Sequence, residues 1–307
     1  MIKSNEHAPI QFKMRGLIMA GGNGTRLSPL TKTINKHLLP VFDKPMIYYP
    51  LTTLMLAGIR EIAIVIRSRD LASFKEILGN GNQLGMQIEY LVQEEALGIP
   101  DGIALASNFI GPNPVCLMLG DNVLIGQGLG RTLSRFTEIA GAQVFAFPVS
   151  NPSEYGVVEL SNDTGKAIRI EEKPKSPRSN LAIPGLYFFD NSVIQRVKKL
   201  KLSSRGEYEI TDLLNSYLTD DVLKIEILER GTGWMDAGTT QSLYGAGELV
   251  RVLQERQGLR IGVPEEVAFR NSWIDKAELT NILDAMPQND YKDYLQKLLG
   301  ENSCSPQ

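Results

Sequence analysis

The residues with the clearest chemical potential lie in a glycine-rich stretch near the start, GGNGTRLSPLTKTINK, which runs from Gly21 to Lys36. Glycines after an apolar run let the backbone approach a ligand closely and offer N–H groups to anionic oxygens. The stretch fits neither the P-loop pattern nor the dinucleotide-binding G-x-G-x-x-G pattern. Because Arg26 and Lys36 flank the glycines, we interpret it as a polyphosphate loop rather than an ordinary turn between strand and helix.

Two aspartates follow apolar segments that are far apart in the sequence. Asp121 comes after the run VCLML, in the string LGDN, and Asp236 lies in WMDAGT. Mg²⁺ in proteins takes one or two carboxylates together with phosphate oxygens and water. Asp121 and Asp236 are therefore candidate magnesium ligands, although Asp121 could be a turn residue and Asp236 could merely cap the following helix.

A shorter charged string, EEKP, occupies Glu171–Pro174. Lys173 could pair with a phosphate, and Glu172 could accept hydrogen bonds from sugar hydroxyls. Alone this string is a weak signal, because a charged strand end before a proline is commonplace.

The elements that must position these side chains alternate between strand and helix patterns in the first half of the chain. Predicted strands cover 16–20, 61–66, 87–92, 115–121 and 143–149, and predicted helices cover 50–58, 71–78, 102–109 and a segment marked by Leu133, Phe136 and Ile139. Such alternation implies βαβ units and a parallel sheet covered on both faces. Ligands of these sheets bind beyond the carboxyl ends of the strands. Gly21–Arg26 and Asp121 should therefore share one crevice.

The second half has shorter, more alternating strands at 155–160, 166–172, 185–190 and 222–228, which we interpret as antiparallel or edge additions, with helices near 191–200 and 208–218. Beyond Thr239 the pattern is mostly helical. We therefore predict an α/β fold with a Rossmann-like, mostly parallel sheet flanked by helices, added antiparallel strands and a C-terminal helical appendage. The expected divisions are a flexible N-terminal extension at 1–13, a core at 14–238 and the appendage at 239–307.

Composition narrows the class of protein further. The chain has 307 residues, 43% hydrophobic and 22% charged, with a formal net charge of −3, which does not favour nucleic-acid or membrane partners. The start of the chain lacks an apolar signal segment, and no run approaches the roughly 20 apolar residues of a membrane helix. Two cysteines, Cys116 and Cys304, do not suggest a disulfide framework. We expect a cytoplasmic protein.

Taken together, the strings resemble one family. MRGLIMAGGNGTRLSPLTKTINKHLLPVFDKPMIYYPLTTLMLAGI is similar to the amino-terminal signature of the sugar-nucleotide pyrophosphorylases, and LGDN, YGVVE, EEKP, GLYFFD, RGEYEITD, WMDAGT, ERQGL and PEEVAFR follow in the family's order. The resemblance covers roughly residues 14–299. It implies a nucleotidyltransferase core of the nucleotide-diphospho-sugar transferase type. It also implies the family's long form, which is a homotetramer with a second, regulatory nucleotide site.

Site residues carried over by this resemblance fall into four groups. The nucleotide-binding residues would be Gly21, Gly22, Gly24, Thr25, Gln93 and Gly98, of which Gln93 and Gly98 contact the base. The catalytic cations would be Arg26, Lys36 and Lys173. The sugar-phosphate side would comprise Asn122, Tyr155, Gly156, Glu172, Lys173 and Tyr187, and the Mg²⁺ ligands would be Asp121 and Asp236.

The sequence departs from the family pattern at three places. Residues 99–102 read IPDG where LAQA or LAHA is usual, so proline and glycine should weaken the start of a helix, and Asp101 adds charge beside the crevice. WMDAGTT lacks a threonine and a histidine that the long form has, and His37 stands where glutamine is usual. These departures affect the expected base and sugar rather than the reaction class.

The implied reaction joins a nucleoside triphosphate to a sugar 1-phosphate and releases pyrophosphate. A phosphate monoester is largely dianionic near pH 7, so no general base is needed. This agrees with the two histidines, since His7 lies in the extension and His37 has no evident partner in the sequence. dTTP and α-D-glucose 1-phosphate are the first expectation, and UTP or a modified hexose 1-phosphate stays open. Two other interpretations are a non-catalytic sugar-nucleotide-binding regulatory subunit and a metal-dependent glycosyltransferase, although the D-x-D string of the latter is missing.

Overall fold

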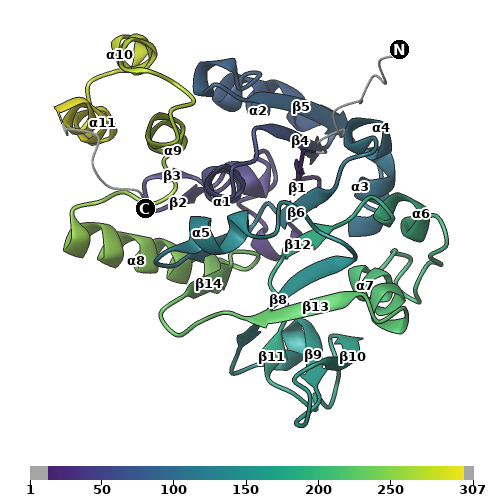
Figure 1. Cartoon of the computed structure of the whole chain (residues 1–307). Coiled ribbons are helices and arrows are strands. Elements are labelled where there is room, and N and C mark those ends of the chain that lie inside the picture. Colours follow the sequence, from purple (N-terminus) through teal and green to yellow (C-terminus); the bar gives the residue numbers. More distant parts are fainter. Residues whose placement is uncertain (1–12, 301–307) are drawn as a thin grey trace, which may run out of the picture.

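A computed structural model describes residues 13–300, and the predicted extension at 1–13 and Cys304 therefore lie outside the described residues except for Lys13. The largest sheet runs in the order β10-β9-β11-β8-β12-β6-β1-β4-β5, and β13 pairs with β8 off this path (Figure 1). Its strands are β1 (Arg15–Met19), β4 (Glu61–Ile66), β5 (Gln87–Val92), β6 (Val115–Leu119), β8 (Ala142–Pro148), β9 (Gly156–Leu160), β10 (Ala167–Glu172), β11 (Leu181–Ala182), β12 (Leu186–Phe189) and β13 (Leu223–Ile227).

The sheet has a parallel half and an antiparallel half. β6, β1, β4 and β5 pair in parallel, whereas β12 joins β6 and β8 antiparallel, and β11, β9 and β10 continue in that sense. β13 is parallel to β8, so it is an edge addition but not an antiparallel one. The predicted mostly parallel sheet with added antiparallel strands is confirmed.

Alternating side chains bury both faces of the sheet. In β1, Leu17 and Ile18 belong to different core clusters and are both fully buried. One face is covered by α1 (Tyr48–Leu56), α2 (Leu71–Leu78), α5 (Leu129–Ser134) and α9 (Pro264–Arg270). The other is covered by α3 (Ile99–Leu105), α4 (Ser107–Ile110), α6 (Val193–Val197) and α7 (Ile210–Thr219). This is the arrangement that near-continuous apolar strands predict.

Two small sheets and the last helices complete the architecture. β7 (Asn122–Ile125) pairs with β14 (Gly233–Asp236), and β2 (Pro40–Val41) pairs with β3 (Lys44–Pro45). The C-terminal helices are α8 (Thr240–Gln257), α9, α10 (Lys276–Ala285) and α11 (Asp290–Gly300), which lie together, away from β9–β11 (Figure 1). None of the helices between residues 13 and 300 has the length and apolar character needed to span a bilayer.

Three predicted helices differ from the structure. α5 ends at Ser134, so Phe136 and Ile139 lie after the helix, where they still pack against the core as partly buried side chains. The helix expected at 102–109 begins at Ile99 and is divided into α3 and α4. Pro100 does not weaken its start, because proline is tolerated in the first helical turn, where backbone N–H groups have no helical partner. The helix expected near 191–200 is only the five-residue α6.

Candidate active site

The glycine loop leaves β1 directly and folds back on itself. It runs through two 3₁₀ turns, at Thr25–Leu27 and Lys36–Leu38. Gly24 has a φ of 64°, and a Cβ added there would lie 2.9 Å from the Thr31 side chain. The Thr31 hydroxyl donates to the Gly24 carbonyl at 2.8 Å. A glycine is therefore needed here for both backbone conformation and space.

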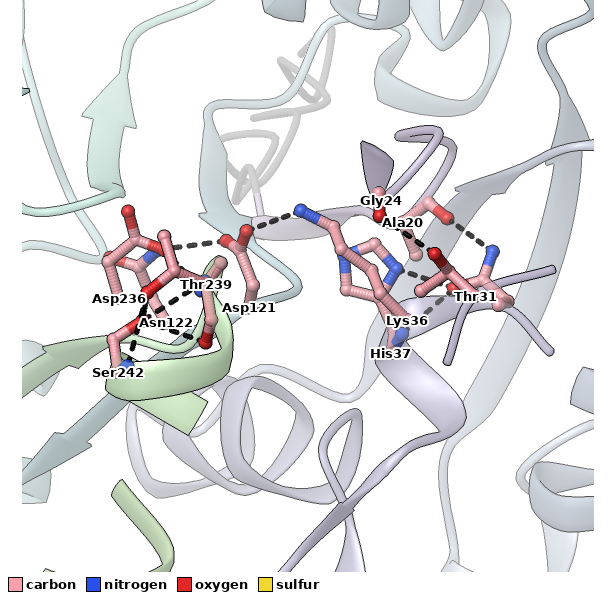
Figure 2. A network of polar contacts seen from close by, with 12 residues as sticks. Ala20, Gly24, Thr31, Lys36, His37, Asp121, Asn122, Asp236, Thr239 and Ser242 are labelled. Atoms are coloured by element: carbon pink, nitrogen blue, oxygen red, sulfur yellow. Dashed lines mark hydrogen bonds and ion pairs between the residues drawn. The ribbon is translucent and has the colours of Figure 1, made fainter. Parts of the chain in front are cut away.

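The second turn directs Lys36 toward Asp121. The distance from Lys36 Nζ to Asp121 Oδ2 is 2.5 Å, and Figure 2 shows the ammonium group reaching the carboxylate. A Cβ at Gly22 would lie 3.5 Å from Lys36 Cε, so the lysine stem passes along the glycine loop. Burial opposes ionisation of Asp121, but Lys36 and a hydrogen bond from Asn122 outweigh it and hold the pKa below its usual range. Asp121 is thus an ionised, paired carboxylate.

Asp236 lies beside Asp121 because β14 and β7 pair there. Asp236 stands opposite Asn122 in the ladder, and the Ala237 N–H donates to the Asp121 carbonyl at 2.8 Å. Burial first, and then the charge of Asp121, raise the pKa of Asp236 to about 6, against the opposing effect of Arg26. A buried and a partly buried carboxylate that repel each other form a place where a cation is favoured.

Arg26 and Asp236 converge over Gly238. A Cβ at Gly238 would lie 2.5 Å from Arg26 Nη2 and 2.7 Å from Asp236 Oδ1, so a side chain at this position would displace these two groups from where they meet. The Gly238 N–H donates to Asp236 Oδ1 at 2.8 Å. Asp236 does not cap α8; Thr239 does, through reciprocal hydrogen bonds with Ser242 that Figure 2 shows. The carboxylate of Asp236 is therefore not occupied by a helix-capping role.

The Asn122 side chain holds the two aspartate-bearing segments together. Its Oδ1 accepts hydrogen bonds from Trp234 Nε1 at 2.6 Å and from the Gly185 N–H at 2.9 Å, and its Nδ2 donates to Asp121 Oδ1 at 3.1 Å. Asn122 is buried, with 3% of its surface exposed. Its amide is satisfied by protein groups on both sides, which makes it a positioning residue for Asp121.

On the expected sugar side, two tyrosines extend the site. The Tyr155 ring packs against Trp234, with centroids 5.1 Å apart, and burial, followed by the charge of Asp236, raises the pKa of Tyr155. Tyr187 is buried, and burial followed by the charges of Glu172 and Asp121 raises the pKa of its phenol. Tyr187 therefore lies close enough to both Asp121 and Glu172 for their charges to affect the pKa of its phenol.

The EEKP segment carries a group of charges around Glu172. Burial raises the pKa of this carboxyl, while Lys173 and Arg205 lower it; their nitrogens lie 3.9 Å and 3.7 Å from Glu172 Oε1. Lys173 has a φ of 44°, an unusual backbone conformation for a lysine. A Cβ at Gly156 would meet Glu172 Oε2 at 3.4 Å. Lys173 thus belongs to a different charge group from Arg26 and Lys36.

On the expected base side, Gln93 and Gly98 have distinct surroundings. Gln93 follows β5 and is buried, and its Nε2 donates to Asp101 Oδ2 at 2.6 Å. Gly98 has a φ of 104°, and a Cβ there would lie 2.2 Å from the Tyr208 carbonyl oxygen. Gly98 is therefore required by its close approach to Tyr208, whatever it contacts in a ligand.

Several residues of this site have no role in the sequence-based prediction. His37 does have a partner, since its Nδ1 lies 2.8 Å from Asn35 Oδ1, and Asn35 in turn donates to Asp70. Arg205 lay in the quoted string RGEYEITD, and the string alone gave no reason to place it near Glu172. The contacts of Asn35 with Asp70 and of Arg205 with Glu172 join separate elements, which sequence patterns cannot reveal, whereas the contact between Asn35 and His37 is local.

The structure therefore brings together Lys36, Asp121, Asp236 and Arg26 around one point, with the glycine loop beside them. Within residues 13–300, no group of three or more histidine, cysteine, aspartate or glutamate side chains gathers to hold a metal. Two carboxylates, with further oxygens from a phosphorylated substrate, still match the preference of a hard divalent cation.

An array of cations and paired carboxylates at the ends of strands in a mostly parallel sheet is suited to transferring a phosphate-bearing group. A model of the nucleotidyl transferase family matches residues 15–251, and the chain belongs to that family. The match extends from β1 into α8.

Named relatives narrow this class. The chain is 50% identical to a glucose-1-phosphate thymidylyltransferase of Mycobacterium tuberculosis over 94% of its own length and 100% of the relative's. It is 47% identical to one of Neisseria meningitidis, over 93% and 99%. A Bacillus anthracis protein described as a glucose-1-phosphate thymidylyltransferase, solved with a sucrose, has a TM-score of 0.73 at 37% identity over 82% of this chain and 99% of its own. A UDP-glucose pyrophosphorylase at 24% identity (78% and 99% covered, TM-score 0.68) shares the fold.

Proposed function

We propose that this nucleotidyl transferase converts dTTP and α-D-glucose 1-phosphate to dTDP-glucose and pyrophosphate. The observation that carries the proposal is the convergence of Lys36, Asp121, Asp236 and Arg26, in a chain whose relatives at about half identity bear the name of this activity. The same convergence argues against a non-catalytic binding subunit, which would not need two neighbouring carboxylates that repel each other.

The chain's own residues would act by position and charge. An oxygen of the sugar phosphate forms a bond to the α-phosphorus of the nucleotide, and the bond from that phosphorus to the bridging oxygen breaks in line, releasing pyrophosphate. The attacking phosphate is already largely dianionic near pH 7, so no side chain needs to take a proton. Arg26 and Lys36 would neutralise charge on the triphosphate, and Lys173 would bind the sugar phosphate.

We further propose Mg²⁺ as the divalent cation, held by Asp121 and Asp236. When bound, it would screen the repulsion between the two substrates' phosphates. The ligand types support this choice, because carboxylate oxygens suit a hard cation. Gly21, Gly22, Gly24 and Thr25 would line the nucleotide, and Tyr155, Gly156, Glu172 and Tyr187 the sugar phosphate.

The division into a core at 14–238 and an appendage at 239–307 is also a proposal. It is supported by the start of α8 directly after Thr239. A homotetramer with a regulatory nucleotide site is proposed on the family resemblance. A groove of about 800 Å³ beside α8 and α11 contains Arg260 and Lys297, but it is also lined by Asp43, Glu255, Asp290 and Asp293, and Arg260 is paired with Asp43, so its charges do not by themselves favour an anionic effector.

The test is a matrix of nucleoside triphosphates against sugar 1-phosphates, with pyrophosphate release as the readout. We expect the highest kcat/KM for dTTP with glucose 1-phosphate, loss of turnover in a chelator and recovery with added Mg²⁺. Asp236→Asn serves as the inactive reference. Pyrophosphate release with no pair would refute the proposed function, and preference for another pair would reassign its substrates.

A further inference from the structure

The departure at IPDG places a carboxylate directly against the proposed base-contacting glutamine. Gln93 Nε2 donates to Asp101 Oδ2 at 2.6 Å (residues eight apart in the sequence). Gln93 has 8% of its surface exposed, and Asp101 is half-buried. Gln93 follows strand β5, and Asp101 lies in the first turn of α3. A side-chain hydrogen bond thus joins two separate elements.

The chemistry of this pair determines which way the glutamine amide faces. An ionised carboxylate only accepts hydrogen bonds, so it must meet the NH₂ group of Gln93 and not its carbonyl oxygen. The carbonyl oxygen consequently faces the glycine loop, where a Cβ added at Gly21 would lie 3.3 Å from Gln93 Oε1. A partner with a neutral amide side chain would not fix the orientation of the Gln93 amide, because both amide groups could flip together and keep their hydrogen bond.

We propose that Asp101 is a positioning residue that fixes the amide of Gln93 so that the nucleotide site presents a hydrogen-bond acceptor to the base. Such a site favours a base whose ring nitrogen carries a proton, as in thymine and uracil, over cytosine, whose N3 is an acceptor. The inference rests on the proposed function, in which Gln93 contacts the base.

The other residues of IPDG hold Asp101 in place. Pro100 is buried and occupies the first turn of α3, where its fixed φ suits the helix. A Cβ at Gly102 would lie 2.2 Å from Met19 Cε, so glycine lets α3 lie close against β1. A negative charge in the first turn is also favoured by the helix dipole. The segment 99–102, which departs from the family pattern, thus holds the Asp101 carboxylate in a fixed position.

The experiment compares Asp101→Asn with the wild type in binding dUDP and dCDP, two nucleotides that differ only at C4 and in the N3 proton. Calorimetry gives both dissociation constants, and turnover of dUTP and dCTP with glucose 1-phosphate is measured in parallel. We expect the wild type to prefer dUDP and the variant to narrow that preference by about tenfold or more, since the freed amide can present its NH₂ group to cytosine. Asp101→Glu, which keeps a carboxylate, should retain part of the preference.

Glu95→Gln is the matched control, because it removes one exposed carboxylate from the neighbouring loop. It should change both affinities equally and leave their ratio unaltered. An unchanged ratio in Asp101→Asn, equal binding of the two nucleotides by the wild type, or binding of neither would overturn the proposal. A wild type that binds dUDP selectively but shows no turnover would refute the proposed function. The ratio of the two dissociation constants in Asp101→Asn would then still decide whether Asp101 positions Gln93.

Discussion

The two aspartates at the centre of the site have opposite surroundings. Asp121, at the end of β6 in the main sheet, is paired with Lys36 at 2.5 Å and bonded by Asn122. Asp236, at the end of β14 in a two-stranded sheet, is bonded by the Gly238 N–H and lies close to Asp121. The pKa of Asp121 is held below its usual range, whereas that of Asp236 is raised to about 6.

The charge of Asp121 is thus balanced by a lysine at hydrogen-bond distance, whereas Asp236 lies against a like charge that raises its pKa. The main sheet supplies a rigid anion–cation pair, and the small sheet places a second anion against it. Asp236 is not needed to cap α8, since Thr239 does so. The repulsion between the two carboxylates is a cost to stability that Arg26 and Lys36 partly offset, and such costs are typical of functional sites.

The largest expected effect on turnover comes from Arg26, the cation beside Asp236. Arg26→Ala should lower kcat by roughly 10²-fold or more, because the guanidinium would stabilise charge that develops on the transferred phosphate. Steady-state kinetics with saturating substrates measure this. Lys32→Ala is the matched control, since Lys32 is an exposed cation on the same loop and should change kcat little. Near-normal turnover in Arg26→Ala would refute its catalytic assignment.

The next effect concerns stability in a metal-free, chelator-containing buffer. Because the pKa of Asp236 rises from 3.8 to about 6 on folding, the folded protein binds more protons than the unfolded chain between those values. Stability therefore falls as pH rises through this window, and the cost is complete above it. At about 1.4 kcal/mol per pH unit, this rise in pKa corresponds to roughly 3 kcal/mol, which Asp236→Asn should gain at pH 8, with almost no gain near pH 4.

Asp121→Asn tests the other carboxylate of the pair. It removes the partner of Lys36, whose side chain is 13% exposed, and should destabilise the protein at pH 8 by roughly 1–3 kcal/mol. Denaturant unfolding of both variants at pH 4 and pH 8 measures the two effects. If both variants change the free energy of unfolding in the same direction at pH 8, the two carboxylates contribute to stability in the same way.

Prediction from the sequence succeeds where local patterns act. The buried strands and the helix Leu71–Leu78 were predicted within one or two residues, since apolar runs and glycine ends mark them. The meeting of the glycine loop with Asp121 also follows from strand order in parallel sheets. The end of α5 was missed because Phe136 and Ile139 continue a helical apolar spacing while packing from a turn.

Prediction fails where two elements far apart in the sequence set a contact. The pKa difference between Asp121 and Asp236 depends on the pairing of β7 with β14, which no local pattern encodes. The role of Gly238 depends on Arg26, more than two hundred residues earlier, reaching the same point. Likewise Asp101 was recognised only as an added charge, because its hydrogen bond to Gln93 joins a strand end to a helix start.

The smallest effect is expected at His37, which directly follows Lys36 on the satisfied side of the site. Burial first, and then Lys36, lower the pKa of His37 to about 3, so its ring is neutral at physiological pH. Asn35 donates its NH₂ group to the Ala20 carbonyl and to Asp70, which leaves its Oδ1 to accept from His37 Nδ1. The imidazole is thus a fixed structural group that stays neutral at physiological pH.

His37→Gln should therefore change kcat by less than about threefold and cost on the order of 1 kcal/mol of stability, through altered packing at a buried position. The decisive measurement is the pH dependence of kcat/KM between pH 5.5 and 9, which should keep the same shape in the variant. A limb of that profile that disappears in His37→Gln would identify His37 as a general base. It would also show that Lys36 and Asp121 adjust the pKa of His37 in addition to neutralising charge.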